Sequence, residues 1–161
     1  MIVIIMGIVG AGKTTVGKLL ASQLGWEFAD ADDFHPPSNV QKIRDGIALT
    51  DEDREPWLDR LRGAIARWIA AGKSVVLACS ALKRSYRAEL LQGPQVRLVY
   101  LKGIAVLIAD RLRSRHGHFA GESILASQLA DLEEPEKTIT VDISDTPEQI
   151  VTEIKRGLTM E

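Results

Sequence analysis

The sequence predicts a three-layer α/β fold, with a five-stranded parallel sheet covered by helices on both faces. Five short apolar runs, rich in valine and isoleucine, recur between longer segments with helical periodicity. The runs lack strict alternation of polar and apolar residues, as is typical of strands buried on both faces of a parallel sheet. Strands that alternate with helices indicate the α/β class. The expected strands are Ile2–Met6, Trp26–Ala29, Ser74–Cys79, Arg97–Leu101 and Thr138–Ile143.

The segments between these runs are predicted to be helices. Lys13–Leu24 follows a glycine-rich turn and stops before Gly25, a natural C-terminal signal. The residues Thr50 to Asp53 resemble a capping box, and the segment after them is apolar at the 3.6-residue helical period as far as Gly72. The apolar stripe of this helix consists of Trp57, Leu58, Leu61, Ile65, Trp68 and Ile69. Further helices are expected at Lys83–Leu91, Ile104–Leu112, Glu122–Leu132 and Pro147–Leu158.

Length and composition favour a single domain over residues 1–161 that binds a small molecule. A chain of 161 residues corresponds to about one domain, and 45% hydrophobic with 26% charged residues is ordinary for a globular protein. The formal net charge of −2 gives no basic excess for nucleic acid or for an anionic membrane surface. No apolar stretch approaches the ~18 residues of a membrane span.

Cysteine content and the N-terminal run predict a cytoplasmic protein. Cys79 is the only cysteine, so no internal disulfide can form, and a reducing compartment is expected. Its apolar neighbours predict a buried structural thiol. The run from Met1 to Met6 lacks a basic n-region and continues into glycines, so we interpret it as a core strand rather than a signal peptide.

The strongest functional signal is a glycine-rich loop between the first strand and the first helix. It satisfies G-x-x-x-x-G-K-[ST], the phosphate-binding P-loop. Its glycines let backbone N–H groups turn toward a phosphate chain, and the helix N-terminus adds its positive end. Lys13 is expected to reach the β- and γ-phosphates of ATP, and the Thr14 hydroxyl to bind Mg²⁺. The predicted nucleotide-binding residues are Gly7, Val9, Gly10, Ala11, Gly12, Lys13, Thr14, Thr15 and Arg111.

Within the P-loop NTPase class, the sequence favours a compact kinase. The N-K-x-D motif, by which guanine-nucleotide switches read their base, is absent from the sequence. A motor or a large ATPase would need a longer chain. Open α/β sheets bind their ligands at the carboxyl edge of the strands, so the acceptor site is expected there.

Three carboxylates follow the second predicted strand, at Asp30, Asp32 and Asp33. Such a cluster is unfavourable unless a cation or a hydrogen-bond donor faces it. If the strand continues through the cluster, Asp30 and Asp32 point the same way, into the crevice of the γ-phosphate. We assign Asp30 to the Mg²⁺ shell and Asp32 to the base that takes the proton of the acceptor hydroxyl, with Asp33 as the alternative base. This interpretation assumes that the second strand lies beside the P-loop strand.

Several longer strings resemble the gluconokinase family, whose members are P-loop kinases related to shikimate kinase. The resemblance spans nearly the whole chain, from Val3 to about Ile143, and the strings are more distinctive than the P-loop alone. They are Asp32-Asp33-Phe34-His35-Pro36-Pro37-Ser38-Asn39-Val40-x-Lys42, Leu49-Thr50-Asp51-Glu52-Asp53-Arg54-x-Pro56-Trp57-Leu58, Cys79-Ser80-Ala81-Leu82-Lys83-Arg84-x-Tyr86-Arg87, Tyr100-Leu101-Lys102-Gly103, Arg111-Leu112-x-x-Arg115-x-Gly117-His118-Phe119, Gln128 and Leu132-Glu133-Glu134-Pro135.

The resemblance implies an ATP- and Mg²⁺-dependent kinase that phosphorylates D-gluconate at the C6 hydroxyl and yields 6-phosphogluconate and ADP. It also suggests a homodimer. A linear polyol that ends in a carboxylate needs cations and several hydrogen-bonding groups. We expect Arg54 and Arg84 to bind the carboxylate, because a guanidinium can hold it with two hydrogen bonds. The alternative cations are Lys42, Lys83 and Arg87, and the groups expected to recognise hydroxyls are His35, Asn39 and Ser80.

A basic segment near residues 111–121 is predicted to be a small lid that closes over the triphosphate. Arg111 and Arg115 lie four residues apart, on one helical face, and could both contact the transferring phosphate oxygens. The two histidines at 116 and 118 have no carboxylate or cysteine at a spacing suitable for a zinc site. By analogy, adenine is expected near Arg111 and Ser144–Pro147, through backbone contacts.

The sequence leaves two other functions open. The first is a shikimate-kinase-like enzyme or another small polyol-acid kinase. Against it, this sequence has Cys79 to Leu82 after the third strand, where the shikimate kinase pattern has a run of glycines. The second is a regulatory module that binds nucleotide without catalysis. It is disfavoured because the predicted residues together make a complete transfer apparatus, namely Lys13, Thr14, Asp30, Asp32 and Arg111.

Overall fold

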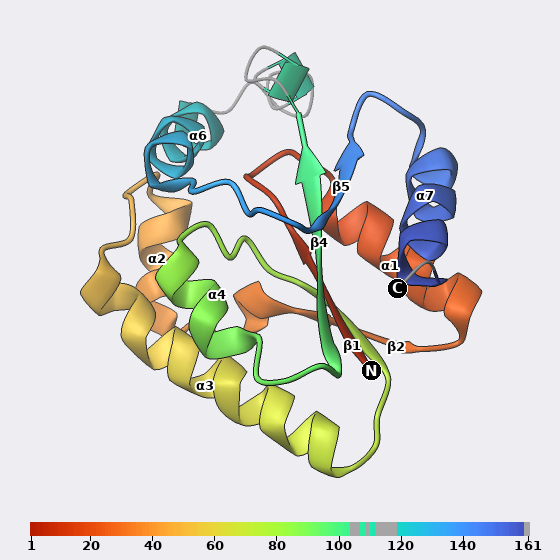
Figure 1. Ribbon diagram of the computed structural model, residues 1–161. Helices are drawn as coiled ribbons and strands as arrows, with labels where there is room; N and C mark the ends of the chain where they lie inside the picture. The colour runs from red at the N-terminus through yellow and green to blue at the C-terminus, as the bar shows by residue number, and fades with distance from the viewer. Residues whose placement is uncertain (104–106, 109, 112–118, 160–161) are drawn as a thin grey trace.

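Five parallel strands form the central sheet of the computed structural model, which describes residues 1–103, 107–108, 110–111 and 119–159, and only the backbone of 119–124. The strand order is β2-β3-β1-β4-β5, so β1 is central and β2 and β5 are the edges (Figure 1). Each predicted strand is confirmed to within a residue or two at either end. The strands are β1 (Ile2–Met6), β2 (Glu27–Asp30), β3 (Val75–Ala78), β4 (Val96–Lys102) and β5 (Ile139–Asp142).

Helices cover both faces of the sheet, which confirms the predicted three-layer α/β class. In Figure 1, α1 and α7 lie on one side of the sheet and α3 and α4 on the other. The short α2 and the C-terminal end of α6 approach the carboxyl ends of the strands. The helices are α1 (Lys13–Leu24), α2 (Pro37–Arg44), α3 (Asp51–Ala70), α4 (Arg84–Leu90), α6 (Phe119–Asp131) and α7 (Pro147–Thr159), and a 3₁₀ helix, η1, spans Ala31–Phe34.

The central strand explains why the sequence shows apolar runs without alternation. All five residues of β1 are buried. Because successive side chains point to opposite faces, Val3 and Ile5 pack with α1 and α7, while Ile2, Ile4 and Met6 pack with α3. Two hydrophobic cores therefore lie on either side of one sheet.

Two short elements were absent from the sequence prediction. Helix α2 begins at Pro37, where a proline is tolerated because the first N–H of a helix has no helical partner. The helix is polar and its buried residue is Asn39, so the sequence has no apolar stripe from which the helix could be predicted. The 3₁₀ helix η1 follows β2 directly and is capped by the Asp30 side chain, which accepts from the Asp32 N–H. The predicted helix at Ile104–Leu112 falls largely outside the described residues.

The sequence predicts no membrane span. Among the helices that the structure describes, none is both long and apolar enough to cross a bilayer.

Candidate active site

The glycine-rich loop turns sharply between β1 and α1, and its glycines are needed for this shape. Gly10 and Gly12 have φ angles of 82° and 95°, in the left-handed region that favours glycine. A Cβ on Gly7 would lie 3.1 Å from the Leu101 carbonyl oxygen of β4, tighter than ordinary contact. Gly12 also forms the N-cap of α1, so the loop delivers its backbone N–H groups to the start of that helix.

A cavity of about 220 Å³ lies over this loop, at the carboxyl ends of β2 and β3. We call it the phosphate cavity. Lys13 lies in its wall and folds back on the loop, where its Nζ donates to the carbonyl oxygens of Gly7, at 2.9 Å, and Ile8, at 3.0 Å. Two neutral carbonyls thus hold the ammonium group in the wall of the cavity, within reach of a phosphate chain bound over the loop. The cavity is lined by Val9, Gly10, Gly12, Lys13, Thr14, Thr15, Asp30, Asp32, Ala78 and Ser80.

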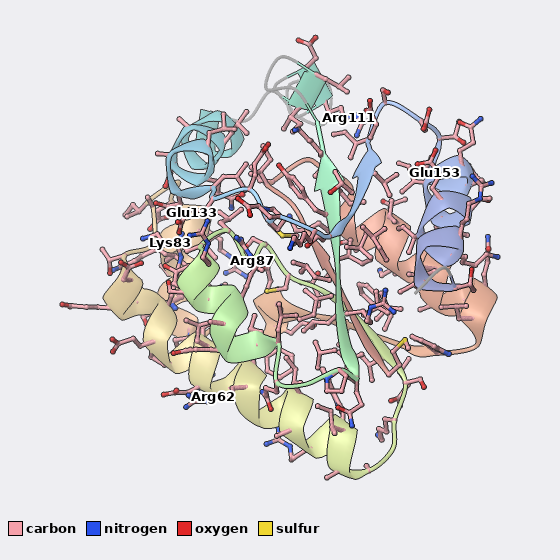
Figure 2. The ribbon with its side chains drawn as sticks, viewed as in Figure 1. Arg62, Lys83, Arg87, Arg111, Glu133 and Glu153 are labelled. Carbon is pink, nitrogen blue, oxygen red and sulfur yellow. The ribbon has the colours of Figure 1, made fainter. Side chains whose placement is uncertain are left out.

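A neighbouring cavity of about 230 Å³ opens on the other side of the loop, between α1 and the start of α7. Ala11 and Arg111 contribute to its wall, together with Asp145 and Pro147. Arg111 donates from Nη2 to the Ile143 carbonyl, which holds it beyond the carboxyl end of β5 (Figure 2). The region expected to hold adenine is therefore hollow and shares Gly10, Gly12 and Thr15 with the phosphate cavity.

The acidic cluster reaches the cleft by a geometry that differs from the expected one. The second strand does not neighbour the P-loop strand, because β3 lies between them. The chain also stops being extended at Asp30, so Asp32 lies in η1 and the prediction of two carboxylates aligned along a strand was wrong. The tight turn of η1 nevertheless brings both Asp30 and Asp32 to the wall of the phosphate cavity. The Thr14 hydroxyl donates to Asp30 Oδ2 at 3.4 Å.

The environment of Asp32 favours its protonated form more than water does. Solvent reaches 79% of its side chain, but the carboxyl lies in a concave cleft among many protein atoms. Partial desolvation in the cleft, and then the charge of Asp30, raise the pKa of Asp32, while the Lys13 charge opposes them. A carboxylate with a raised pKa is a stronger base, which suits a group that accepts a proton.

A third cavity, of about 140 Å³, adjoins the phosphate cavity, and we call it the acceptor cavity. Val9, Lys13, Asp32 and Ser80 line both, so the two cavities meet at these four residues. The remaining lining residues are His35, Ile43, Ala48, Leu49, Arg54, Trp57, Ser127 and Gln128. The mixture of apolar and polar groups is typical of a site for one small molecule.

His35 is held rigidly in the wall of the acceptor cavity. Its ring stacks on Trp57 with centroids 4.8 Å apart and planes 11° apart. Trp57 is itself fixed by its indole N–H, which donates to the Ala31 carbonyl at 2.7 Å. Burial, and then the nearby Arg54 charge, lower the pKa of His35 to about 4, so the imidazole is neutral at physiological pH. Its Nε2 lies 4.0 Å from Asp32 Oδ1.

Arg54 is the buried cation of the acceptor cavity. Only 8% of the residue is exposed. Its Nη1 donates to Tyr86 Oη at 2.9 Å and to Asp131 Oδ2 at 3.1 Å, so helices α3, α4 and α6 meet at this guanidinium. Tyr86 in turn donates to Asp51, which also accepts from Lys83 at 2.8 Å. A guanidinium fixed on one side by such a network can present its remaining donors in a defined direction.

Comparison with known proteins decides the family. The family model described as "Shikimate kinase" matches residues 9–159. A "Probable gluconokinase" of Xenopus tropicalis is 42% identical, covering 96% of this chain and 92% of the relative. The "Gluconokinase" of Gluconobacter oxydans is 44% identical, covering 98% of this chain and 91% of the relative. The chain belongs to the gluconokinase family. Its fold matches the crystal structure of a gluconokinase from Sinorhizobium meliloti, with a TM-score of 0.85, 41% identity and coverage of 97% and 90%.

Membership of the gluconokinase family makes this chain a P-loop kinase, a class that uses ATP. Several residues of the strings on which the sequence resemblance rests line the two cavities. Asp32 and Ser80 line both cavities, and His35 and Arg54 lie in the wall of the acceptor cavity.

The other cations expected to bind the acceptor lie elsewhere in this gluconokinase-family fold. Lys42 donates to both carboxylate oxygens of Asp53 at 2.9 Å, within the capping region of α3. Lys83 is paired with Asp51 outside the cavity lining. Arg84, which was expected together with Arg54 to bind the substrate carboxylate, lines a separate cavity beside α4 together with Arg87. Figure 2 shows Lys83 and Arg87 near Glu133 and away from Arg111.

Two further predicted residues have structural partners, and one cannot be placed. Arg87 is buried and donates to the carbonyl oxygens of Ala81, Leu82 and Glu133 at 2.8 to 3.0 Å. Asn39 lies behind His35 and donates to the Asp53 carbonyl at 2.7 Å. Arg115, and most of the predicted lid at about 111–121, lie outside the described residues.

Sequence reasoning missed the contribution of α6. Gln128 and Ser127 line the acceptor cavity, and Asp131 pairs with Arg54. Gln128 was noted within the family resemblance, but a single glutamine on a helix has no spacing signature that marks it as functional. Its sequence distance from the P-loop gave no reason to place it there.

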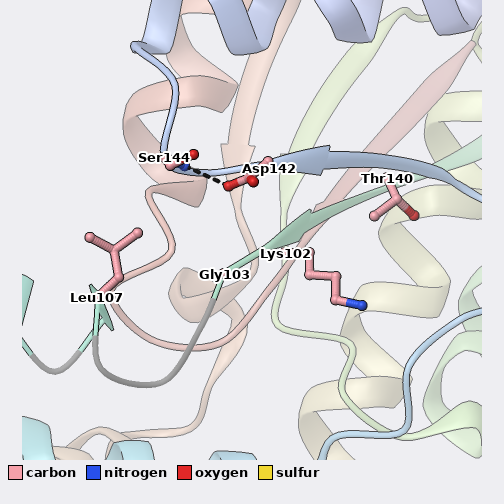
Figure 3. A pocket seen from close by; sticks show the side chains of 6 residues that line it. All are labelled: Lys102, Gly103, Leu107, Thr140, Asp142 and Ser144. Carbon is pink, nitrogen blue, oxygen red and sulfur yellow. Dashed lines mark hydrogen bonds between the residues drawn. The ribbon is translucent and has the colours of Figure 1, made fainter.

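A separate cavity of about 520 Å³ lies at the carboxyl ends of β4 and β5 (Figure 3). The Asp142 carboxylate at its edge accepts from the Ser144 N–H at 2.8 Å. Ser144, from the region expected to hold adenine, is the one predicted residue in its wall, which consists of Lys102, Gly103, Leu107, Thr140, Asp142 and Ser144. The volume of a cavity alone would therefore have pointed away from the residues that carry the chemistry.

Proposed function

We propose that the protein transfers the γ-phosphate of ATP to the C6 hydroxyl of D-gluconate and releases 6-phosphogluconate and ADP. The observation that carries the proposal is the junction of two cavities at Lys13 and Asp32, with the phosphate loop on one side and a buried arginine on the other. The gluconokinase relatives support the choice of acceptor. The proposal also accounts for an acceptor cavity that contains both hydrogen-bonding groups and a cation.

In the proposed reaction, the acceptor oxygen attacks the γ-phosphorus, and the bond between this phosphorus and the β,γ-bridging oxygen breaks. The Asp32 carboxylate receives the hydroxyl proton, and ADP leaves with the electrons of the broken bond. Lys13 moves from the Gly7 and Ile8 carbonyls to the β- and γ-phosphate oxygens. Arg111, and Arg115 from the lid segment, neutralise charge on the transferring group; arginines in this role are worth roughly 10³–10⁵ in rate.

Thr14 and Asp30 are the residues that fit Mg²⁺. Their oxygens face each other at 3.4 Å at the edge of the phosphate cavity, and Mg²⁺ takes hard oxygen ligands. In the described part of the chain, no three acidic, histidine or cysteine side chains form a metal cluster, which agrees with a cation bound through phosphates, water and one or two side chains. When bound, Mg²⁺ would neutralise phosphate charge. We expect activity to disappear with EDTA and to return with added Mg²⁺.

We assign the gluconate carboxylate to Arg54 and the hydroxyls to His35 and Ser80. Of the five cations expected to bind the acceptor, Arg54 is the one that lines the acceptor cavity. The family resemblance further predicts a homodimer, which light scattering after size exclusion will test, and the sequence itself predicts a cytoplasmic location.

An ADP-release assay with a panel of acceptors tests the substrate. We expect steady release with D-gluconate, and much slower release with aldoses, which lack the carboxylate, and with shikimate. If shikimate or another aldonate is turned over faster than D-gluconate, that compound replaces gluconate as the proposed acceptor. Nucleotide binding without turnover of any member of the panel would favour a regulatory module.

Replacing Asp32 tests the proposed base. Asp32→Asn keeps the size of the side chain but removes the proton acceptor, so we expect kcat to fall by about 10²- to 10⁴-fold. Binding of an ATP analogue should change little. Asp33→Asn is the matched control, because Asp33 neighbours Asp32 and does not line either cavity. Near-normal turnover of Asp32→Asn, or a comparable loss in Asp33→Asn, would remove Asp32 from this role.

A further inference from the structure

Gln128 connects the phosphate loop to the acceptor cavity. Its side-chain Oε1 accepts a hydrogen bond from the Val9 N–H at 2.6 Å, across 119 residues of sequence. Val9 lines both cavities, and Gln128 lines the acceptor cavity. The contact therefore lies where the transferred phosphate and the acceptor hydroxyl have to meet.

The partner of the glutamine fixes the orientation of its amide. A backbone N–H can only donate, so the atom that faces Val9 must be the amide oxygen. The other branch of the same planar group is the NH₂, which carries two donors and has no acceptor capacity. An acceptor with several hydroxyl oxygens offers suitable partners for these donors.

The helix that carries Gln128 is fixed at the end nearest this residue. Asp131, three residues further and on the same face of α6, accepts from Arg54 at 3.1 Å. Immediately after the helix, the Glu133 N–H donates to the Leu82 carbonyl at 2.9 Å and the Glu133 carboxylate accepts from the Arg84 N–H at 3.1 Å. A side chain on such an anchored element can position a substrate more closely than one on an unsupported loop.

The loop is shaped by two side chains acting on adjacent residues. Lys13 binds the carbonyl oxygens of Gly7 and Ile8, and Gln128 binds the next N–H along the chain. When nucleotide draws Lys13 to its phosphates, the Gln128 contact is the one of the two that can stay in place. Gln128 therefore can preserve the loop shape while ATP binds.

We infer that Gln128 is a positioning residue that couples the two substrates: its oxygen holds the P-loop at Val9 while its NH₂ group binds a hydroxyl oxygen of the acceptor. This inference rests on the proposed function for the identity of the acceptor. It has two consequences. Acceptor binding should tighten nucleotide binding, because both depend on one amide, and losing the amide should uncouple them.

Two substitutions separate the oxygen from the NH₂ group. Gln128→Met keeps a similar length but can form neither bond, whereas Gln128→Glu keeps an oxygen for Val9 and loses both donors. We expect kcat/KM for D-gluconate to fall about 5- to 100-fold in both variants. The amide ¹⁵N–¹H resonance of Val9 should shift upfield in the proton dimension in Gln128→Met, and keep its hydrogen-bonded position in Gln128→Glu. Leu129→Ala, at an exposed neighbouring position, is the control and should match the wild type in each measurement.

Calorimetric titration of a non-hydrolysable ATP analogue measures the coupling. In the wild type, saturating D-gluconate should tighten the analogue about five-fold or more, and in Gln128→Met the factor should approach one. An unchanged factor in Gln128→Met, no coupling in the wild type, or a wild-type KM for gluconate in Gln128→Glu would each overturn the inference. If the wild type does not phosphorylate gluconate, the proposed function fails. The Val9 resonance still tests the contact with the loop in that case.

Discussion

At the scale of single residues, Asn39 determines which nitrogen of His35 carries the proton. Asn39 Nδ2 donates to the Asp53 carbonyl at 2.7 Å, and this contact fixes the amide orientation because a carbonyl can only accept. The same Nδ2 lies 3.2 Å from His35 Nδ1, which must then be the acceptor. The proton therefore sits on Nε2, on the side of Asp32 and the acceptor cavity.

This arrangement predicts a pH-dependent loss of stability. The histidine of the unfolded chain binds a proton near its ordinary pKa of 6.5, but burial and Arg54 lower the folded pKa to about 4. Between these values the unfolded state binds more protons, so the free energy of unfolding decreases as pH falls from 6.5 toward 4. We expect this decrease, measured by urea unfolding, to be smaller in His35→Gln, whose amide cannot titrate.

The comparison isolates His35 because the other two histidines, at 116 and 118, and all the carboxylates are present in both proteins. The charged groups near the imidazole are Arg54, which disfavours its protonation, and Asp32, which would favour it. Equal pH dependence in the two proteins would contradict the lowered pKa and the neutral donor that we assign to His35.

At the scale of elements, Arg54 and Arg87 look alike in sequence but have different surroundings. Arg54 joins α3 to α6 in the wall of the acceptor cavity. Arg87 lies on α4 and binds three carbonyl oxygens, two before α4 and one after α6. The first should affect the substrate, and the second should hold two segments together.

Substitution by methionine should separate these two roles. Arg87→Met leaves three carbonyl groups without their donor, so we expect a loss of about 3 kcal/mol in the free energy of unfolding and a KM for gluconate within about two-fold of wild type. Arg54→Met should raise that KM by about 10-fold or more, because the carboxylate loses its cation. Arg84→Met, at an exposed position on α4, is the control and should change stability by less than about 0.5 kcal/mol. A large KM effect from Arg87→Met or Arg84→Met would return those residues to the substrate site.

Elements with a strong local signal were predictable from sequence, and those determined by tertiary contacts were not. The five strands and α1 could be predicted from apolar runs and glycines, because the residues that determine these elements are consecutive in the sequence. The prolines and polar residues of α2 gave no such signal. The phosphate loop was recognisable because its mechanism demands fixed spacing. The choice of Arg54 among several cations, and the approach of Gln128 to Val9, depend on how distant helices pack.

At the scale of the whole molecule, the active site lies along the carboxyl edge of a sheet that is packed on both faces. Cys79 follows β3 within this arrangement, 1% exposed and joined to β1 through the hydrogen bond from its N–H to the Ile5 carbonyl. Burial raises the pKa of its thiol to about 12, so the reactive thiolate is scarce in the folded state. As the single cysteine of the chain, Cys79 reports when the core opens.

Labelling of Cys79 by a thiol reagent should therefore be slow, and should become slower still when nucleotide binds. A ligand that binds only the folded state at about 100 times its Kd stabilises that state by about 2.7 kcal/mol, which lowers the open population about 100-fold. With labelling slower than reclosing, MgATP should reduce the labelling rate by a similar factor. In Lys13→Met, which lacks the phosphate-binding ammonium, the same MgATP concentration should slow labelling far less.

The dependence of the labelling rate on urea concentration distinguishes global opening from local shielding by the nucleotide, because only global opening exposes the large surface that gives a steep slope. Rapid labelling without nucleotide, or protection that persists in full in Lys13→Met, would show that Cys79 is not buried in the stable core or that the loop does not hold the phosphates.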